Sequence, residues 1–503
     1  MDAAWVSAVS MGMALSTTRS IAELQAEAER PTLRRVLGPL NLTALGVGSV
    51  IGTGIFVLTG TAASQNAGPA LVISMIIAAV ACALAGLCYA ELASMIPVAG
   101  SAYTYAYASS GEFVAWIIGW DLILEYALSG ATVAVGWSGY FMSFLRDLGF
   151  ALPSALTAAR GAAAVLADGS VVPGVFNLPA AAIVLLVTGL LVLGIRQSAN
   201  TNTGLVLLKT GVLIVFVALG VAYVRRENLV PFVPPNTGEF GHFGWSGVLR
   251  GAAVMFFAYV GFDAVSTAAQ EAKNPQRDMP IGILASLAIC TVIYIAVAVV
   301  LLGIVPYQRL NVADPIAVGI DATGLTWFSP VVKISALFGL FSTMLVQLLG
   351  QTRIFYSMSR DGLLPDLFGR VHPRFRTPWI STTITGVVVA VAAGLLPIGV
   401  LSQLVSMGSL LAFLLVCVGV LLLRRSAPDV HRPFRVPGVP WVPVLGGLTC
   451  LAQMLSLPRS TWERLVIWMA LGFVVYFLYS RRRARARRLE REELAAMPAT
   501  IGG

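Results

Sequence analysis

Four glycines stand close together within an otherwise apolar stretch. They are Gly46, Gly48, Gly52 and Gly54, in the segment GVGSVIGTG within residues 40–66. Glycine destabilises a helix interior, and backbone that unwinds inside a membrane is tolerated where it lines a cavity. The N-terminus of a half-helix there presents free N–H groups and a positive dipole end to an anion. An amino acid carboxylate is such an anion, so the segment predicts a carboxylate-binding site.

Other interpretations of the same glycines compete with this one. Gly48 and Gly52 form a GxxxG pair, which packs helices together, and a simple kink also accounts for them. A dinucleotide fingerprint requires a preceding strand in a βαβ unit, and the apolar surroundings exclude it. Helix packing and a kink stay open from the residues alone.

A second irregular helix is predicted over residues 246–270. In FFAYVGFDAVSTAAQE, Gly261 lies in the middle and Asp263 follows it among apolar residues. A carboxylate inside a membrane costs about 2.5 kcal/mol or more on insertion scales and usually marks function. Asp263 is therefore a candidate proton-coupling residue, with a structural hydrogen-bonding role as the alternative.

Lys209 stands in a third apolar stretch, GLVLLKTGVLIVFVALG. Its side chain is long enough to snorkel towards the membrane surface. The functional hypothesis is that Lys209 carries a desolvated ammonium. This group would take up and release a proton, or would occupy a place where a sodium ion would bind. Glu125, in the predicted span 112–145, is a weaker candidate proton partner, and a packed, hydrogen-bonded carboxyl is its alternative.

Metal and disulfide chemistry are not indicated. The five cysteines all lie within apolar runs and form no CxxC pair. The three histidines fall in separate loops, a pattern unlike a metal cluster. We expect no metal and no cofactor.

The composition identifies the solvent that must surround these residues. Apolar residues make up 57% of the 503-residue chain and charged residues only 11%, against about 25% charged in soluble domains. Roughly 20 apolar residues span a bilayer. Twelve stretches meet this requirement: 40–66, 69–96, 112–145, 178–196, 203–225, 246–270, 281–305, 328–358, 378–396, 399–423, 438–456 and 464–480. The predicted fold class is an all-α polytopic membrane protein with twelve transmembrane helices.

The placement of basic residues predicts the orientation. The net charge of +9 is concentrated in short gaps between apolar runs, including the cluster 481–488. No basic face or nucleic-acid module is visible, so nucleic acid is not an expected partner. The positive-inside rule places both termini in the cytoplasm. Residues 1–39 are then a cytoplasmic N-terminal tail and 481–503 a basic cytoplasmic tail. The external connection 146–177 has no predicted role.

The two glycine-interrupted helices lie five spans apart, which predicts an internal repeat. Five is odd, so two five-helix halves would insert with opposite topology, the arrangement of inverted-repeat transporters with a site between the breaks. Residues 40–225 would form the first repeat and 246–423 the second. Residues 438–480 would add helices 11 and 12.

Four motifs in this chain resemble the amino acid–polyamine–organocation superfamily, in particular its bacterial cationic-amino-acid-transporter-like branch. They are LGPLNLTALGVGSVIGTGIFVLTG, PVAGSAYTYAYASSGEFVAWIIGWDLILEYAL, FFAYVGFDAVSTAAQEAKNPQRDMPIGI and YSMSRDGLLP. The resemblance covers about residues 33–480. It implies the five-plus-five inverted-repeat fold, of leucine-transporter type, with a central substrate site.

The resemblance also implies roles for individual residues. Backbone N–H groups at Gly52, Thr53 and Gly54 would hold the substrate carboxylate. Backbone carbonyls at Val50, Phe257, Ala258 and Val260 would hold its ammonium group, and Phe257 would be an aromatic lid. Lys209 matches the lysine that replaces a sodium site in proton-coupled members.

The predicted function is secondary active transport of L-amino acids across the cytoplasmic membrane, by proton symport and alternating access. No sodium is expected, and the protein is not expected to be an enzyme. No acidic residue stands among the backbone-binding positions, which favours a small or medium neutral amino acid. An amino acid/polyamine exchanger and a non-transporting amino acid sensor are the alternatives. The expected partners are the substrate and the bilayer, and an accessory small membrane protein is left open.

Overall fold

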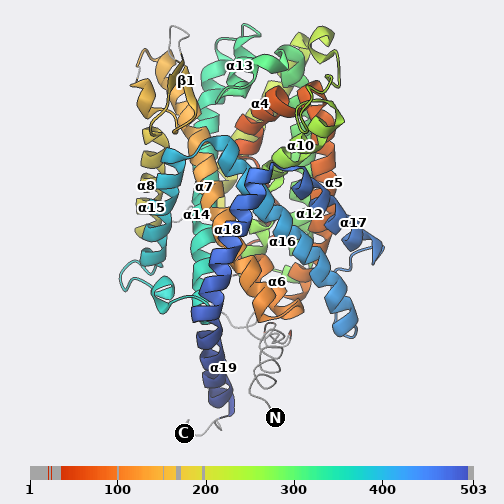
Figure 1. The fold of residues 1–503 in the computed structure, drawn as a ribbon, viewed down its shortest axis with the longest axis vertical. Helices are drawn as coiled ribbons and strands as arrows, with labels where there is room; N and C mark the ends of the chain where they lie inside the picture. Colours follow the sequence, from red (N-terminus) through yellow and green to blue (C-terminus); the bar gives the residue numbers. More distant parts are fainter. Residues whose placement is uncertain are drawn as a thin grey trace.

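The computed structural model describes residues 21, 24, 35–98, 101–150, 152–165, 171–194 and 199–496. The predicted N-terminal tail 1–39 falls almost entirely outside the described residues, as does the end of the predicted tail 481–503. The described chain is predominantly helical (Figure 1). A two-stranded antiparallel sheet, β1 (Ala163–Val165) with β2 (Val171–Pro173), lies at the end of the molecule opposite α19 (Arg481–Ala496).

Two long helices form the centre of one side of the bundle. They are α7 (Glu112–Asp147) and α14 (Phe328–Arg360), which pack against each other along much of their length. α16 (Ile398–Ser426) packs on α7, and α12 (Pro275–Ile304) packs on α5 (Leu71–Met95). These contacts join segments from the two halves of the chain.

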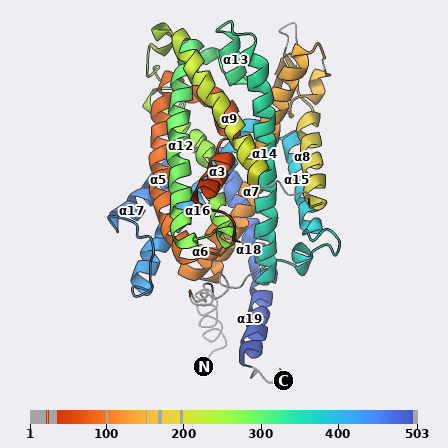
Figure 2. The same ribbon diagram turned by 180° about the vertical axis from the view of Figure 1, so that it is seen from behind.

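The short helix α3 (Pro39–Val50) lies inside the bundle. It contacts α12, α14 and α9 (Ala199–Gly220), which surround it in Figure 2. The chain then continues through the π-helical turn η1 (Gly54–Leu58). The first apolar stretch is therefore enclosed by other helices and does not face lipid over the part that contains its glycines.

The other elements complete the bundle and its connections. The remaining helices are α4 (Thr59–Ala62), α6 (Ser101–Ser109), α8 (Leu178–Val192), α10 (Gly244–Phe256), α11 (Ala264–Thr267), α13 (Pro315–Asp321), α15 (Trp379–Leu395), α17 (Trp441–Ser456) and α18 (Arg459–Val475). The other π-helical and 3-10 turns are η2 (Ala63–Ala67), η3 (Gly68–Ala70), η4 (Ser154–Leu156), η5 (Val221–Tyr223), η6 (Arg226–Leu229), η7 (Phe257–Tyr259), η8 (Ala269–Glu271), η9 (Tyr307–Arg309), η10 (Asp366–Gly369) and η11 (Tyr476–Ser480).

Eight helical stretches among the described residues are long and apolar enough to cross a membrane. The first of them, Pro39–Met95, includes both predicted spans 40–66 and 69–96. Three shorter apolar helices, α8, α15 and α17, lie where further spans were expected. The count of twelve spans and the inverted repeat stay predictions. Length and composition alone do not show that Pro39–Met95 crosses the membrane twice, or that the three short helices cross it at all.

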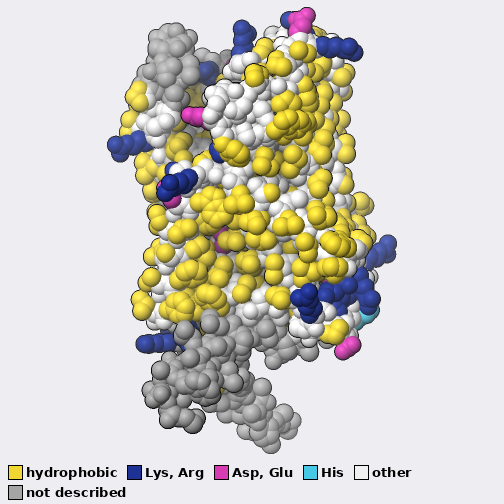
Figure 3. Space-filling model, turned by 45° about the vertical axis from the view of Figure 1, so that its right-hand side comes forward, with side chains coloured by type: hydrophobic (Ala, Val, Ile, Leu, Met, Phe, Trp, Pro, Cys, Tyr) yellow, Lys and Arg dark blue, Asp and Glu magenta, His cyan; other side chains and the backbone are white. Residues whose placement is uncertain are grey.

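The surface has the distribution of side chains that a bilayer requires. Hydrophobic side chains cover a broad middle band, and Lys and Arg gather near the ends of the molecule (Figure 3). Soluble proteins rarely expose contiguous apolar patches of this size. The protein is therefore membrane-embedded, with its charged ends at the two membrane surfaces.

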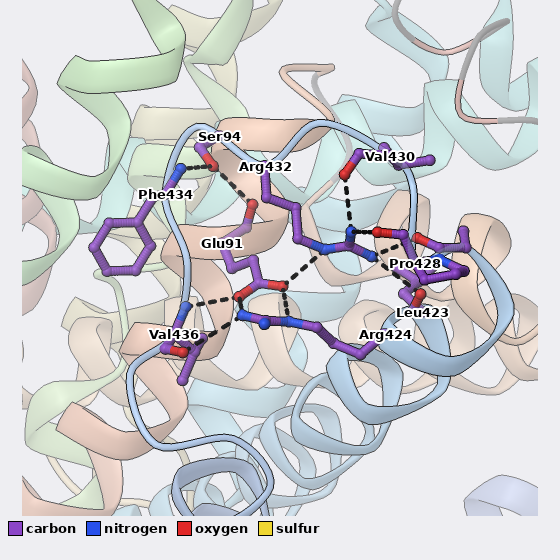
Figure 4. Close-up of polar contacts among 10 residues, drawn as sticks. Glu91, Ser94, Leu423, Arg424, Pro428, Val430, Arg432, Phe434 and Val436 are labelled. Carbon is purple, nitrogen blue, oxygen red and sulfur yellow. Dashed lines mark hydrogen bonds and ion pairs between the residues drawn. The ribbon is translucent and has the colours of Figure 1, made fainter.

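A buried ion cluster fixes one end of α5 to α16 (Figure 4). Both carboxylate oxygens of Glu91 accept hydrogen bonds from Arg424, at 2.9 and 2.6 Å, and Arg432 lies 3.3 Å away. The backbone N–H of Val436 donates to the same carboxylate at 2.7 Å. Because Glu91 is only 1% exposed, its charge is compensated entirely by these neighbours. The cluster holds the connection between α16 and α17 against α5.

Candidate functional site

The helix that begins at Pro39 stops at Val50 and the chain re-enters a helical turn only at Gly54. Ile51 has an extended conformation, with φ −71° and ψ 96°. The next backbone bond across the gap runs from the Phe56 N–H to the Gly52 oxygen at 3.2 Å. The first N–H groups of a helix have no partner within it. The N–H groups of Gly52, Thr53 and Gly54 are therefore the ones that a bound anion would meet.

The second interruption lies in the helix that begins at Gly244. After α10 ends at Phe256 and η7 at Tyr259, Val260 is extended, with φ −60° and ψ 134°. Gly261 follows with φ 123°, a conformation that side chains other than glycine rarely adopt. A Cβ at this position would lie 2.9 Å from the backbone of Ser49. Glycine is thus required here both by the backbone angle and by the close approach of α3.

The two interruptions touch. A Cβ placed on Gly54 would lie 2.3 Å from the Ala258 Cα atom, so the two unwound segments are in backbone contact. The hydroxyl of Tyr294, from α12, lies 2.8 Å from the Val50 oxygen and 3.0 Å from the Ala258 oxygen. Tyr294 therefore bridges the ends of both interrupted helices.

A small cavity lies between the interruptions. Its volume is about 10 Å³, roughly the space for one water molecule. Its wall is formed by Ser49, Val50, Gly52, Thr53, Gly54, Ser129, Val133, Phe257, Val260, Thr343 and Gln347. Six of the seven predicted substrate-binding residues are in this wall. Ala258 is absent from it and instead packs against Gly54.

Two hydroxyl groups at the cavity are buried without a partner in the described part of the chain. They are Ser49 Oγ and Thr53 Oγ1, on either side of the α3 interruption. A buried polar atom without a hydrogen bond is costly. Both groups are available to a polar ligand that enters the cavity.

Lys209 lies beside the same interruption. Its side chain is fully buried, and its ammonium donates to the Ile51 oxygen at 2.7 Å, to Thr343 Oγ1 at 3.1 Å and to the Gly48 oxygen. A cation at the C-terminal end of a helix is stabilised by the free carbonyls there. Gly339 makes room for the lysine, since a Cβ at Gly339 would lie 3.1 Å from the Lys209 Cδ atom. The cation occupies a position formed by three oxygen atoms.

The other two predicted proton-coupling residues lie in a separate polar cluster. Asp263 accepts a hydrogen bond from the Tyr126 hydroxyl at 3.0 Å. Glu125 is 2% exposed, and one of its carboxylate oxygens has no partner within the described residues. Neither residue is in the cavity wall, and the ammonium of Lys209 bonds to neither of them.

Several site residues were missed by the sequence reasoning. Thr343 and Gln347 line the cavity from α14. Gln351 follows one turn later, and its buried side-chain oxygen has no hydrogen-bond partner among the described residues. Their spacing of four residues places them on one helix face. A row of polar residues within the apolar span 328–358 is visible in the sequence and could have indicated that this helix face lines a site. Tyr294 and Ser129 have no comparable signal.

Comparisons with known proteins identify the family to which this chain belongs. The model of the amino acid permease family matches residues 37–478. A methylthioribose transporter of Bacillus subtilis (strain 168) is 47% identical over 459 residues, covering 91% of this chain and 96% of that protein. A branched-chain amino acid permease of the same organism is 47% identical, covering 90% and 95%. A vacuolar cationic amino acid transporter of Arabidopsis thaliana is 40% identical, covering 79% and 64%.

The family match indicates a transporter. The match extends from the start of α3 to the end of the bundle, and the two interrupted helices both lie within it. The chain belongs to the amino acid permease family, within the amino acid–polyamine–organocation superfamily.

Proposed function

We propose that this protein is a secondary active transporter that carries neutral L-amino acids across the cell membrane by proton symport. The observation that carries the proposal is the cavity enclosed by the two interrupted helices, with Lys209 bound at the end of one of them. We propose twelve spans, in two inverted five-helix repeats over 40–225 and 246–423 with two further helices in 438–480, and both termini in the cytoplasm.

In the proposed complex, the unwound backbone binds both charged groups of the substrate. The N–H groups of Gly52, Thr53 and Gly54 hold the carboxylate, assisted by the unpartnered hydroxyls of Ser49 and Thr53. The carbonyls of Val50, Phe257, Ala258 and Val260 surround the ammonium. A carbonyl oxygen has two lone pairs, so Val50 and Ala258 can accept from the substrate as well as from Tyr294.

Substrate binding would then favour closure of the site. Because the carboxylate and the ammonium groups satisfy backbone atoms of both interrupted helices, the ligand joins the two halves of the molecule. Phe257, which lies in the cavity wall, would close over it. Spans one, two, six and seven would rock against three, four, eight and nine to open the cytoplasmic side.

Lys209 is the proposed coupling group. Its ammonium stands among two carbonyl oxygens and one hydroxyl oxygen, and oxygen ligands of this kind suit hard cations. A covalently attached cation at that place makes a bound sodium ion unnecessary. Loss of its proton would release the end of α3, which links the protonation of Lys209 to the geometry of the carboxylate site. Glu125 and Asp263 are weaker candidates in a proton path.

A neutral substrate is favoured by the chemistry of the cavity wall. The wall contains hydroxyls, one amide and apolar groups but no carboxylate. A cationic side chain would find no counter-charge there. The name of the branched-chain amino acid permease agrees with a neutral substrate. Because the methylthioribose transporter is similar to this chain to the same degree, methylthioribose is the alternative substrate. Exchange and sensing without transport are the alternative activities.

Thermal unfolding in the presence of candidate ligands tests the proposed substrate class. A ligand that binds only the native protein raises its apparent stability, by about 2.7 kcal/mol at 100 times Kd. We expect leucine, isoleucine or valine to raise the Tm in a stereoselective manner, with an effect that differs between pH 5.5 and 8. Stabilisation by methylthioribose or arginine, and by none of the neutral amino acids, would refute the proposed substrate class.

A further inference from the structure

A second cavity lies far from the central site, at the end of the molecule where α12 begins. Its volume is about 630 Å³, within the roughly 300–1,000 Å³ of small-molecule sites. One wall is formed by the first turns of α12 and the other by Pro433 and Phe434 in the connection between α16 and α17. The space is therefore a crevice between two elements that are distant in the sequence.

The crevice changes from polar to apolar along its length. Asn274, Gln276 and Arg277 form its polar part, at the start of α12. Ile281, Leu284 and Ala285 form its apolar part, on the next two turns. From Arg277 to Leu284 the rise along the helix is about 10 Å. A ligand that fits this crevice has one polar end and one apolar end.

The apolar part continues as a stripe on the outer surface of α12. Ile281, Ile289, Val292 and Val299 are each at least 37% exposed, and the spacing of Ile281, Val292 and Val299 places these three close to one line along the helix. The stripe leads from the crevice into the apolar band that faces the bilayer. A hydrocarbon chain that starts in the crevice can therefore follow α12 into the membrane.

The polar part of the crevice is positively charged. Arg277 lines the crevice and is exposed. Lys273 and Arg435, which are near lining residues in the sequence, are exposed as well. The nearest carboxylate on α12, Asp278, is buried and accepts a hydrogen bond from the Asn274 N–H at 3.1 Å. Basic side chains next to a membrane attract anionic headgroups, by about 1 kcal/mol each.

The wall opposite α12 is held in place by the Glu91 cluster. The Phe434 N–H donates to Ser94 Oγ at 3.3 Å, and the Val436 N–H donates to Glu91. Figure 4 shows the Phe434 ring turned away from the Glu91 carboxylate. The backbone of this segment is thus fixed to α5, while the aromatic ring is left to line the crevice.

We propose that this crevice binds an anionic membrane phospholipid. The phosphate lies at Arg277, with Gln276 and Asn274 as hydrogen-bonding neighbours. One acyl chain lies between Phe434 and Leu284 and follows the apolar stripe of α12 into the bilayer. The bound lipid joins the start of α12 to the α16–α17 connection. This site is independent of the central cavity and of the substrate.

Native mass spectrometry of the full-length protein, purified in detergent and supplied with phosphatidylglycerol or phosphatidylcholine, tests the proposal. The two lipids share a phosphate and differ in net charge. We expect the wild type to retain phosphatidylglycerol more strongly. Arg277→Gln should lower that retention roughly fivefold, the factor that corresponds to one basic residue. Arg370→Gln, at an exposed arginine outside the crevice, is the matched control and should leave retention unchanged.

The apolar wall is tested separately. Ala285→Phe fills the crevice and should reduce the retention of both lipids. Ile281→Ser, at a side chain that is 40% exposed, removes apolar contact without a change in the packed core. It should lower the retention of both lipids as well. If Arg370→Gln and Arg277→Gln lowered the retention of phosphatidylglycerol equally, the effect would be one of overall charge, and the proposal would be overturned. Unchanged retention in both Ala285→Phe and Ile281→Ser would place the lipid outside the crevice and overturn it too.

Discussion

The ammonium of Lys209 lies 2.7 Å from the carbonyl oxygen of Ile51, the residue that follows the end of α3. These two residues are 158 positions apart in the chain. The hydrogen bond connects α9 to the unwound segment that follows α3. Any change in the charge of Lys209 therefore acts directly on the backbone that we propose holds the substrate carboxylate.

Replacement of Lys209 tests its proposed coupling role. Lys209→Ala removes the only proposed proton carrier that contacts the unwound segment, so we expect proton-driven accumulation to be abolished. Uptake measured over a range of pH values should then lose its pH dependence. Arg370→Ala, which alters an exposed basic residue outside both proposed sites, is the control and should behave as the wild type does. An unaltered pH dependence of uptake in Lys209→Ala would refute the assignment.

Removal of the Tyr294 hydroxyl should affect the empty protein more than the substrate-bound protein. Tyr294→Phe leaves the Val50 and Ala258 carbonyls without this donor, and we expect a loss of about 0.6–1.7 kcal/mol of stability. A bound substrate ammonium supplies donors to the same carbonyls, so substrate should raise the Tm more in Tyr294→Phe than in the wild type. Tyr259→Phe removes a hydroxyl that bonds to Met75 instead and should not enlarge the substrate effect. An identical substrate-induced shift in wild type and Tyr294→Phe would argue against ammonium binding at these carbonyls.

A methyl group at Gly54 should abolish transport. In Gly54→Ala the new Cβ would meet Ala258 Cα at 2.3 Å, which forces the two unwound segments apart. Gly189→Ala, in the last turn of α8 with no atom within 4 Å of the new Cβ, is the matched control. Alanine is preferred in helices by up to about 1 kcal/mol, so this control should be neutral or slightly stabilising. Uptake assays on both variants check the expectation, and full activity in Gly54→Ala would contradict the close packing of the two interruptions.

Neutralisation of Glu91 should strongly destabilise the protein. Glu91→Gln leaves Arg424 and the buried Arg432 without a counter-charge, and removal of one partner from a buried ion pair costs about 3–5 kcal/mol. A large fall in Tm in a thermal unfolding assay is the expected result. Glu463→Gln breaks an exposed pair with Arg459, for which little change is expected. Equal Tm values for the two variants would show that the Glu91 cluster does not stabilise this end of the bundle.

The local features of the site could be predicted from the sequence because they change the composition of an apolar span. The glycines of 46–54, Gly261 with Asp263, and Lys209 are each unusual within a membrane helix. The structure places Gly52, Gly54 and Gly261 at helix interruptions. Gly46 and Gly48 lie within α3, and the ammonium of Lys209 lies at the end of α3. An unusual residue in a membrane span carries information because its insertion is costly.

The contacts between helices could not be predicted in the same way. Tyr294 is an ordinary residue in an apolar span, and only the packing of α12 on α3 brings its hydroxyl to Val50. The partners of Glu91 lie more than 330 residues away in the chain. The contact between Gly54 and Ala258 likewise joins two segments that are far apart in the sequence. These relations depend on the arrangement of helices, which spacing along the sequence does not determine.

Accumulation of radiolabelled leucine in proteoliposomes tests the central claim most directly. The purified protein is reconstituted, and uptake is followed with an inward proton gradient, without a gradient, and with a protonophore, all in sodium-free buffer. We predict accumulation above the external concentration only with the gradient, collapse on addition of the protonophore, and recovery of unmodified leucine from the vesicles. Uptake that never exceeds the external concentration under the gradient, or that requires sodium, would contradict proton symport.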